Sequence, residues 1–485
     1  MSKRTRREFL ENSMWAAAAT TTAAATPGMM FADDKQSSSP NEKLGVACVG
    51  VKGRGGSHIG AYAGRKDTEI LYICDADRDV GNSRADGVAQ KQKNRPKFEE
   101  DIRKVLEDDS VDIVCIATPN HWHALGAIWA IQAGKDVYVE KPVSHNVTEG
   151  RRIVEAARKY GKICQTGTQS RSNPGMREIM QAIHDGKIGD VKVARGLCYK
   201  PRGSIGARGE YDVPKSVNYD LWSGPADVMP LTRRSLHYDW HWQWPYGNGD
   251  LGNQGIHQMD LARWGLNVNE LSRGVISYGG RFGYEDAGDT ANTQVVVHDY
   301  GDSSLVFEVR GLKTDDYRGS RIGVIFEGSE GYAVIPSYSG GTLFDKDGKQ
   351  IASFNKGSDS YHFQNFLDAV RSRKHEDLNA DIEDGHLSSA LCHLGNISYR
   401  LGDMLNANQC LERMESVMTA EDVSATMKRF LSHLKDNNVQ IEGDVVQTGN
   451  FLKFNPKTET FVSNEKADAM LTREYRAPFV VPEKV

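Results

Sequence analysis

The stretch Asp136-Val-Tyr-Val-Glu140-Lys141-Pro142 carries the strongest structural signal in the chain. Apolar and aromatic residues typical of a buried strand run into a proline, which has no amide hydrogen and ends a strand. A carboxylate and an ammonium therefore follow at the carboxyl end of a strand, the edge where open α/β sheets bind ligands. Alone, Glu-Lys-Pro is more typical of a surface Glu-Lys pair at a strand end, so its neighbours along the chain decide its interpretation.

A glycine-rich turn precedes this stretch by about ninety residues. An apolar run of strand length, residues 44–49, leads into Gly50-Val-Lys-Gly-Arg-Gly-Gly56 and then a predicted helix. Such a turn lets backbone amides approach a pyrophosphate at a helix N-terminus. Gly50 and Gly55 match the first and third glycines of G-x-G-x-x-G, but Lys52 holds the second place with Gly53 beside it. A glycine turn without a ligand therefore remains an alternative.

The second predicted strand, residues 69–74, ends in Asp75, which lies 25 residues after Gly50. That position is typical of the acid that binds the ribose hydroxyls of a dinucleotide. A carboxylate there repels a 2′-phosphate, so NAD is favoured as the cofactor, although the nearby Arg78 leaves NADP possible. An ordinary turn residue at a strand end is the plainer alternative for Asp75.

The chain then alternates between helix and strand. Helices are predicted at 99–107, 124–133 and 147–160, and strands at 111–117, 136–139 and 163–165. This βαβ alternation predicts an α/β fold with a doubly wound, parallel Rossmann sheet. The turn Thr118-Pro119-Asn120 can present polar groups to a cofactor. His121 and His123 have no carboxylate or cysteine at ligand spacing, so we interpret them as turn and cap residues and expect no metal.

The glycine turn, Asp75, Thr118-Pro119-Asn120 and Glu140-Lys141-Pro142, in this order, resemble the glucose–fructose oxidoreductase / inositol dehydrogenase (Gfo/Idh/MocA) family over roughly residues 43–402. The resemblance implies that Lys141 lies beside the nicotinamide and the reacting hydroxyl, and that Glu140 contacts the cofactor. The residues expected to bind cofactor are Gly50, Gly53, Arg54, Gly55, Asp75, Thr118, Pro119, Asn120, His123, Glu140, Lys141 and Gln169.

From residue 169 the pattern becomes β-rich. Strand-like runs occur at 191–199, 274–282, 293–298, 304–309, 322–326 and 332–335, with turn signals at Gly301-Asp302, Gly340-Gly341 and Asp347-Gly348. They predict an α+β domain with a large, mostly antiparallel open sheet and helices on one face. In the family the open face often forms a subunit interface, which implies a homo-oligomer. The expected domains are a signal and linker (1–42), the NAD-binding domain (43–168), a substrate and oligomerisation domain (169–402) and a C-terminal extension (403–485).

A predicted helix beginning near Gly252 carries Asn253, His257 and Asp260 on one face. Alone, His257 is more typical of a buried, hydrogen-bonded histidine. The family's helix carries Asp-x-Gly-x-His beside the substrate; Gly255 and His257 match, but Asn253 replaces the aspartate. Asparagine cannot accept a proton, so the resemblance implies that His257 and Lys141 carry the proton chemistry.

Several residues are weaker candidates for binding substrate. Trp222, Trp240, Trp242 and Trp244 can stack on sugar rings, although buried tryptophan is equally typical of a core or an interface. Arg202 follows a predicted strand and can bind a carboxylate or hydroxyl, although a solvated arginine is the plainer alternative. We expect substrate contacts from Arg202, Asn253 and His257.

The composition is that of a globular protein of two or three domains. The chain has 485 residues, 39% hydrophobic and 26% charged, and its net charge of -5 gives no reason to expect nucleic acid. Its seven cysteines include no C-x-x-C, and five lie in apolar runs, so they read as buried small side chains rather than disulfides or ligands.

The N-terminus resembles a twin-arginine export signal. Arg6-Arg7 is followed by Phe9-Leu10 and an Ala/Thr-rich stretch too short for a membrane span, with cleavage after Ala25 or Ala32. A disordered basic tail is the alternative. We expect export by the twin-arginine route to the periplasm or the outside of the cell, with no stable membrane span after signal cleavage.

Together these features predict an NAD(P)-dependent oxidoreductase acting on a secondary hydroxyl of a sugar, polyol or glycoside. Free NAD is not expected outside the cytoplasm, so a tightly bound cofactor is favoured. One alternative is a redox-neutral glycosidase or lyase that uses transient oxidation, and another is a non-catalytic sugar- or NAD-binding protein. Residues 474–482 are apolar enough to dock somewhere, for example on a neighbouring subunit.

Overall fold

The computed structural model describes residues 43–485. The predicted export signal and linker, residues 1–42, lie outside them. Within the described part, no helix combines the length and apolar character needed to cross a membrane. All seven cysteines are buried and free, as expected for small apolar side chains.

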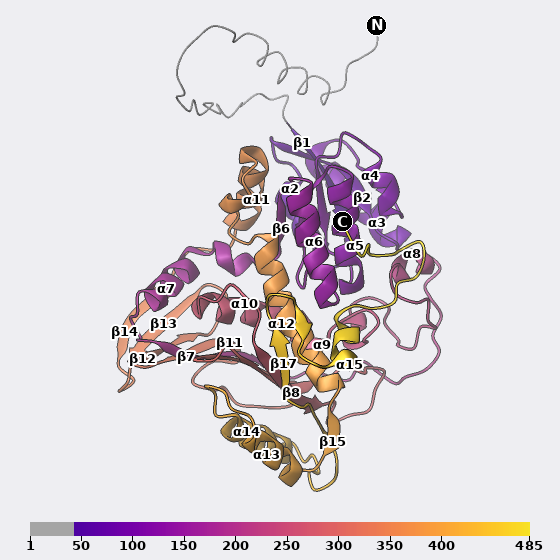
Figure 1. The fold of residues 1–485 in the computed structure, drawn as a ribbon. Helices are drawn as coiled ribbons and strands as arrows, with labels where there is room; N and C mark the ends of the chain where they lie inside the picture. The colour runs from indigo at the N-terminus through magenta and orange to yellow at the C-terminus, as the bar shows by residue number, and fades with distance from the viewer. Residues whose placement is uncertain (1–42) are drawn as a thin grey trace, which may run out of the picture. The chain divides into compact units, whose positions relative to one another are not determined.

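The first domain contains six parallel strands in the described chain (Figure 1). Their order across the sheet is β3 (Lys97–Glu99), β2 (Thr68–Cys74), β1 (Leu44–Val49), β4 (Ile113–Ile116), β5 (Asp136–Val139) and β6 (Cys164–Thr166). The order reverses between β1 and β4, which is the switch point where such sheets bind ligands. The predicted Rossmann sheet is confirmed. Strand β3 was not expected, and the helix predicted at 99–107 is shorter.

Helices cover both faces of this sheet. One apolar core packs α4 (Ile102–Leu106), α5 (Asn120–Gln132) and α6 (Val147–Lys159) against it. The other packs α2 (Gly55–Tyr62), α3 (Arg78–Gln92) and the later helix α11 (Tyr361–Ser372). Helix α11 joins this domain because Phe366 and Leu367 are fully buried against it.

The second sheet is large and mostly antiparallel, as predicted. In the described residues its path is β14 (Gln350–Asn355), β13 (Gly340–Asp345), β12 (Gly331–Ile335), β11 (Ile322–Gly328), β7 (Val191–Tyr199), β10 (Ser304–Arg310), β9 (Thr293–Asp299), β8 (Gly274–Gly280), β16 (Val446–Thr448) and β15 (Asp403–Leu405). Strand β17 (Leu452–Asn455) pairs with β8 and with β18 (Thr460–Phe461). Only β7 and β10 pair in parallel among these strands of the described chain.

Four of these strands, β13 to β16, were not predicted from the sequence, whereas β17 and β18 lie in residues 451–462, which were expected to be extended. Gly340-Gly341 was predicted as a turn but begins β13. A side chain on Gly341 would meet the carbonyl of Val334 on the neighbouring strand, so glycine serves close strand pairing here.

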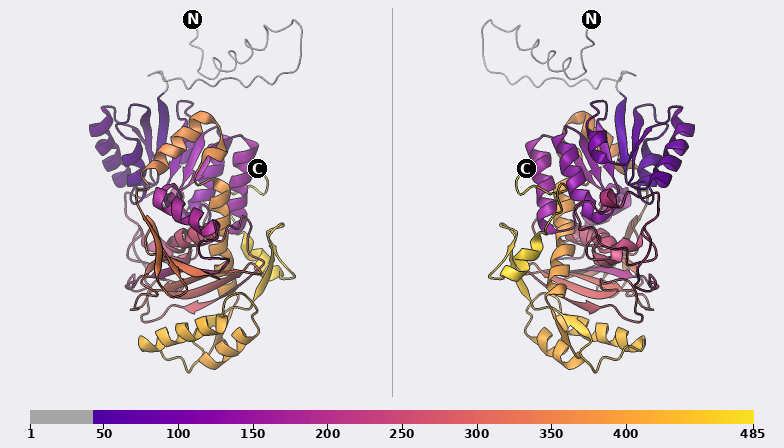
Figure 2. Two further views of the ribbon diagram at one scale, coloured as in Figure 1. Left: turned by 90° about the vertical axis from the view of Figure 1, so that its left-hand side faces the viewer. Right: turned by 90° about the vertical axis from the view of Figure 1, so that its right-hand side faces the viewer.

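One face of the second sheet packs on α7 (Pro174–His184), α10 (Gly255–Gly265) and α12 (Ile382–Arg400). Its opposite face is not fully open. Helices α13 (Ala407–Glu415) and α14 (Val423–Asp436) of the C-terminal extension lie against it (Figure 2). Phe430 of α14, for example, meets Tyr278 of β8 edge to face. The surface expected to form a subunit interface is therefore covered in part by the chain itself.

Buried charges join the extension to the sheet. Arg195 of β7 donates to Glu308 of β10 at 2.8 Å and to Glu421, just before α14, at 2.7 Å. Burial opposes ionisation of Glu308, but the positive charges of Arg195, Arg429 and Arg310 lower its pKa overall. Such a cluster is expensive to break because a charge is then left in a dry environment.

We expect Glu421→Ala to destabilise the protein by about 3 kcal/mol, near the low end for breaking a buried ion pair, because Arg195 keeps Glu308 as a partner. Urea unfolding followed by circular dichroism measures the change. Glu412→Ala, on the exposed side of α13, is the matched control and should leave the free energy of unfolding within about 0.5 kcal/mol. Equal free energies of unfolding for the two variants would contradict a role for the Arg195–Glu421 ion pair in holding the extension on the sheet.

The last residues pack on the first domain of the same chain. Phe479 and Val481 are buried in the core between α4, α5 and the sheet. The apolar segment 474–482, which was predicted to dock somewhere, therefore docks on its own chain.

Candidate functional site

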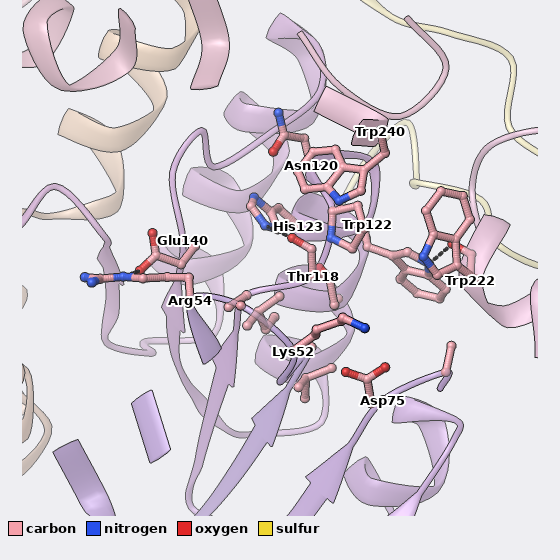
Figure 3. A pocket seen from close by; sticks show the side chains of 18 of the residues that line it. Lys52, Arg54, Asp75, Thr118, Asn120, Trp122, His123, Glu140, Trp222 and Trp240 are labelled. Carbon is pink, nitrogen blue, oxygen red and sulfur yellow. Dashed lines mark hydrogen bonds and ion pairs between the residues drawn. The ribbon is translucent and has the colours of Figure 1, made fainter. Parts of the chain in front are cut away.

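A cavity of about 480 Å³ opens at the carboxyl ends of β1, β2, β4 and β5. The first domain lines it with the loops after its strands and with α5. The second domain contributes Gln169, the segment between β7 and α9 (Gly249–Asn253), Asn253 of α9 and His257 of α10. Figure 3 shows the first-domain side chains Lys52, Asp75 and Thr118 facing Trp222 and Trp240 of the segment between β7 and α9. The volume of this cavity is in the range of natural small-molecule sites.

The glycine turn closes tightly under the start of α2. Gly50 has φ of 76°, and a side chain on it would lie 2.6 Å from the amide nitrogen of Thr118. A side chain on Gly55 would overlap the carbonyl oxygen of Gly50. Gly53 and Arg54 line the cavity, whereas Gly55 supports the turn from outside it. A glycine turn that leads into a helix N-terminus in this way suits a pyrophosphate.

Asp75 lies at the end of β2 with its carboxylate toward the cavity (Figure 3). Its oxygens accept the amide of Val51 at 2.7 Å and that of Asp77 at 3.0 Å. Burial nevertheless raises its pKa. These two bonds fix the carboxylate where ribose hydroxyls could donate to it.

The turn after β4 contributes polar groups that lack protein partners. Thr118 Oγ1 and, across the cavity, Gln169 Oε1 are buried without a hydrogen bond from the described residues. Pro119 and Asn120 also line the cavity, and Asn120 donates to Asn248 at 3.0 Å. Buried polar groups are normally satisfied, so unpaired oxygens in a cavity suit a ligand that donates hydrogen bonds.

His123 lies between two backbone carbonyls. Its ring nitrogens approach the oxygen of Pro142 at 2.6 Å and that of Thr118 at 2.7 Å. Burial lowers its pKa. The ring thus connects the Thr118 turn to the Glu140-Lys141-Pro142 loop and lines the cavity as well.

Glu140 is held in a charged cluster at the cavity wall. It accepts from Arg54 Nε at 2.8 Å and lies 3.1 Å from His58 Nε2. Burial opposes ionisation, but the hydrogen bond from His58 and the charge of Arg54 hold the pKa of Glu140 far below its usual value. Glu140 therefore stays ionised and positions Arg54, which also faces the cavity.

Lys141 and His257 line the same cavity. Lys141 Nζ donates to the backbone carbonyl of Asn253 at 2.7 Å, and burial lowers the lysine's pKa. Burial and the nearby charge of Lys141 lower the pKa of His257 to about 3. The ring of His257 is therefore neutral at physiological pH, and its only described ring contact is with Tyr338, edge to face at 5.2 Å.

The helix predicted near Gly252 is broken at Gln254 into α9 and α10. Asn253 and His257 line the cavity, but Asp260 does not. Its carboxylate faces the protein interior, where it accepts from Arg171 at 2.8 Å. Asp260, which was placed on the same helix face but not assigned to the site, therefore serves the interior instead, since a buried arginine needs that carboxylate.

Arg202 is not among the residues that line the cavity. Its guanidinium donates to both carboxylate oxygens of Asp250, at 2.7 and 3.0 Å, and lies over the ring of Trp242. This geometry thus gives no support to the predicted substrate contact from Arg202, because two N–H groups of its guanidinium already donate to the buried carboxylate of Asp250.

Of the four tryptophans considered as sugar-stacking candidates, two line the cavity and two pack elsewhere. Trp222 and Trp240 line the cavity, whereas Trp242 packs behind Arg202 and Trp244 lies against Arg400. A further lining residue, His241, stacks on Trp240 with ring centroids 3.6 Å apart.

His241 was not predicted as a site residue. Its Nδ1 contacts the carbonyl oxygen of Tyr238; a carbonyl only accepts, so Nδ1 carries the proton and Nε2 is left as an acceptor. Burial lowers its pKa to about 3. The signal available in the sequence was its place among the alternating tryptophans of residues 240–244. Within residues 43–485, no group of three or more His, Cys, Asp or Glu side chains is arranged to hold a metal.

Two family models match the chain. The Gfo/Idh/MocA model described as an oxidoreductase family with an NAD-binding Rossmann fold matches residues 44–168, and the model of that family's C-terminal alpha/beta domain matches residues 205–431. Together they cover well over half of the chain.

Curated relatives align over part of their length. An alpha-N-acetylgalactosaminidase of Shewanella oneidensis is 29% identical over 156 residues, 31% of this chain and 34% of the relative. An inositol 2-dehydrogenase of Salmonella paratyphi B is 28% identical over 188 residues, 38% of this chain and 53% of the relative. The chain thus spans about a third to a half of these relatives.

Among solved structures, the WlbA dehydrogenase of Bordetella pertussis, crystallised with NADH and UDP-GlcNAcA, superposes with a TM-score of 0.54. It is 20% identical, and the superposition covers 73% of this chain and 95% of that one. This likeness supports the two-domain fold.

Proposed function

Because this chain belongs to the Gfo/Idh/MocA family of NAD-binding oxidoreductases, we propose that it transfers hydride between tightly bound NAD and a secondary hydroxyl of a sugar, polyol or glycoside. One observation carries this function. Lys141 and His257 line the same cavity as the glycine turn and Asp75, so a dinucleotide on the turn would share its space with both. The unpaired Thr118 and Gln169 oxygens support a ligand in that cavity.

In this mechanism His257, Lys141 and the Glu140–Arg54 pair each have a separate role. NAD, when bound, supplies the hydride acceptor. The neutral ring of His257 takes the proton of the reacting hydroxyl. The ammonium of Lys141, oriented by the Asn253 carbonyl, stabilises the developing alkoxide. Glu140 and Arg54 keep the cofactor side of the cavity charged and ordered.

A redox-neutral glycosidase or lyase is the second candidate. The glycosidase relatives favour it, although they align over only about a third of their length. Transient oxidation acidifies the carbon beside the new carbonyl, and a base removes its proton as the glycosidic oxygen leaves with a proton. In a glycosidase water then adds to the resulting double bond, whereas in a lyase the double bond remains. The hydride finally returns to the carbonyl carbon. This scheme needs a second base for the carbon proton, and His241, with Nε2 as an acceptor, supplies one.

The test uses the purified protein with NAD or NADP and a panel of sugars, polyols and aryl glycosides. Bound cofactor is measured by absorbance and mass spectrometry. Net cofactor reduction identifies a dehydrogenase, and product without net reduction identifies hydride shuttling or glycoside cleavage, which product analysis separates. Binding of sugar or NAD without turnover across the panel would support the non-catalytic alternative. We expect tighter binding of NAD than NADP because of Asp75.

Export and assembly are further parts of the proposal. We propose twin-arginine export of the folded protein to the periplasm or the medium, which cell fractionation and N-terminal sequencing of the mature protein test. We also propose a homo-oligomer through the part of the second sheet beyond α13 and α14, where Tyr332 and Phe344 stack. Light scattering after gel filtration measures its size.

A further inference from the structure

The cavity is covered by a segment that we call the strap, residues 200–246 between β7 and α9. It contains only the short helix α8 (Tyr219–Ser223) and one turn of 3-10 helix, η2 (Asp239–Trp242). Leu221 and Trp222 of the strap line the cavity opposite Asp75, as Figure 3 shows for Trp222. The strap therefore lies on the outer side of the space available to a dinucleotide.

The strap contacts the first domain directly after Asp75. The amide of Asn218 donates to the Ala76 carbonyl at 2.8 Å, and the amide of Arg78 donates to the Ser216 carbonyl at 3.0 Å. His237 Nε2 lies 2.9 Å from the carboxylate of Asp77. A ligand bound at Asp75 would leave the cavity on this side only if these contacts opened.

The strap has little regular secondary structure, and its interior is one small apolar cluster around the buried Arg233. Helix α8 is only five residues long, and the strap's apolar cluster has five buried members. Segments with few buried apolar contacts open at low cost. Contacts from elsewhere in the chain should therefore decide how often it opens.

Such contacts come from the tail, residues 472–485. Arg476 donates to the Asp220 carboxylate at 2.6 Å, to the Asp220 carbonyl at 2.9 Å, and to the carbonyls of Gly224 and Ala226 at 3.2 and 3.3 Å. One guanidinium thus binds both ends of the last turn of α8. Arg473 adds a bond to the Pro245 carbonyl at 2.9 Å.

The tail is in turn anchored on the first domain. Phe479 is 1% exposed and meets Trp122 of α5 edge to face, with centroids 5.4 Å apart. The Arg476 guanidinium lies over the Phe479 ring at 4.8 Å. Trp122 Nε1 itself donates to the Leu221 carbonyl of α8 at 2.9 Å. Tail, strap and α5 therefore form one connected unit beside the cavity.

We infer that the tail holds the strap closed over bound dinucleotide, with Arg476 as the positioning residue, so that the protein keeps its cofactor between turnovers. This inference rests on the proposed function and adds a consequence to it. A retained cofactor cannot be exchanged for oxidised NAD from solution. The hydride taken from one substrate must then return to the product or pass to a second carbonyl compound in the same cavity, which leaves the cofactor unchanged overall.

The test measures release of NADH from the full-length protein. NADH is loaded, excess NAD is added, and the loss of bound NADH fluorescence gives the dissociation rate. We expect Arg476→Ala to raise this rate about 10-fold or more, because hydrogen bonds from a charged donor are lost. Arg413→Ala, which removes an ion pair with Asp403 in the extension, is the matched control and should not change the rate.

A second set of variants separates positioning from general destabilisation. Asp220→Ala should raise the release rate of NADH. The double variant, Asp220→Ala with Arg476→Ala, should raise it by less than the product of the two single effects, because the two residues act through the same contact. Thermal midpoints should stay within a few degrees of the wild type. Equal release from wild type and Arg476→Ala would overturn the inference while leaving the function intact. A wild-type protein that binds neither NADH nor NADPH would instead overturn the proposed function.

Discussion

Lys141→Ala is expected to lower kcat by about 10²- to 10⁴-fold while NAD stays bound. Its ammonium lies in the cavity, held by the Asn253 carbonyl at 2.7 Å, where a positive charge would stabilise an alkoxide. The affinity for NAD should change little, because the glycine turn and Asp75 lie at other parts of the cavity. Turnover on the active sugar and a parallel NAD titration measure the two effects.

The matched control is Lys104→Ala, which removes an exposed lysine from α4 and should leave kcat unchanged. Full activity of Lys141→Ala with cofactor bound would remove the central role given to this residue. Loss of NAD binding in step with activity would instead make Lys141 a cofactor ligand.

The pH profile tests the same assignment independently. Burial lowers the pKa of Lys141, so its charge is lost at lower pH than that of an exposed lysine. If the ammonium is the active form, kcat falls as pH rises through that pKa, and Asn253→Asp moves the fall to higher pH because a carboxylate favours the charged lysine. His257, with a pKa of about 3, should produce no inflection near pH 6.5. A kcat that rises through the alkaline range would make Lys141 the general base.

Gly55→Ala is expected to weaken NAD binding by about 10- to 100-fold. Its new methyl group would overlap the carbonyl oxygen of Gly50, and forcing such an overlap costs about 1–3 kcal/mol, where 1.4 kcal/mol is tenfold in affinity. The turn must open to relieve it, which moves the amides at the start of α2. Isothermal titration with NAD measures the loss.

Gly60→Ala is the control within the same helix, since a side chain there meets no atom within 4 Å. It should bind NAD as the wild type does and be slightly more stable, because alanine favours helix over glycine. Circular dichroism of Gly55→Ala checks that the variant is folded. Normal NAD affinity in a folded Gly55→Ala would show that the turn does not hold the pyrophosphate.

Local pattern was enough to predict the first domain. Alternating helix and strand signals, a glycine turn and a proline after Lys141 are properties of neighbouring residues, and parallel topology follows from them by general rules. For the same reason the strands 191–199 and 293–298 were placed within a residue of their observed bounds. The short strands β13 to β16 were missed because glycine and polar residues weaken their pattern, and pairing with neighbours stabilises them instead.

Long-range contacts decided which candidates reach the cavity. Arg202 and Asp260 carry groups suited to a site, but Asp250 and Arg171 engage them elsewhere. His241 enters the cavity because the strap folds back across the first domain, a path that no spacing in the chain predicts. Burial then set the proton affinity of His257 and Lys141, which depends on surroundings rather than on residue type.

The residues alone thus specified a dinucleotide fold and the family resemblance, through the stretch around Glu140-Lys141-Pro142, the glycine turn and Asp75. These features could be interpreted from the sequence because they depend only on where strands end and on local turn geometry. The enclosure of that site depends on partners far away in the chain. Arg476 meets Asp220 across 256 residues, and Glu421 meets Arg195 across 226. Such pairs are chosen by which surfaces the packed domains bring together, so only the tertiary structure revealed the strap, the tail and the covered face of the second sheet.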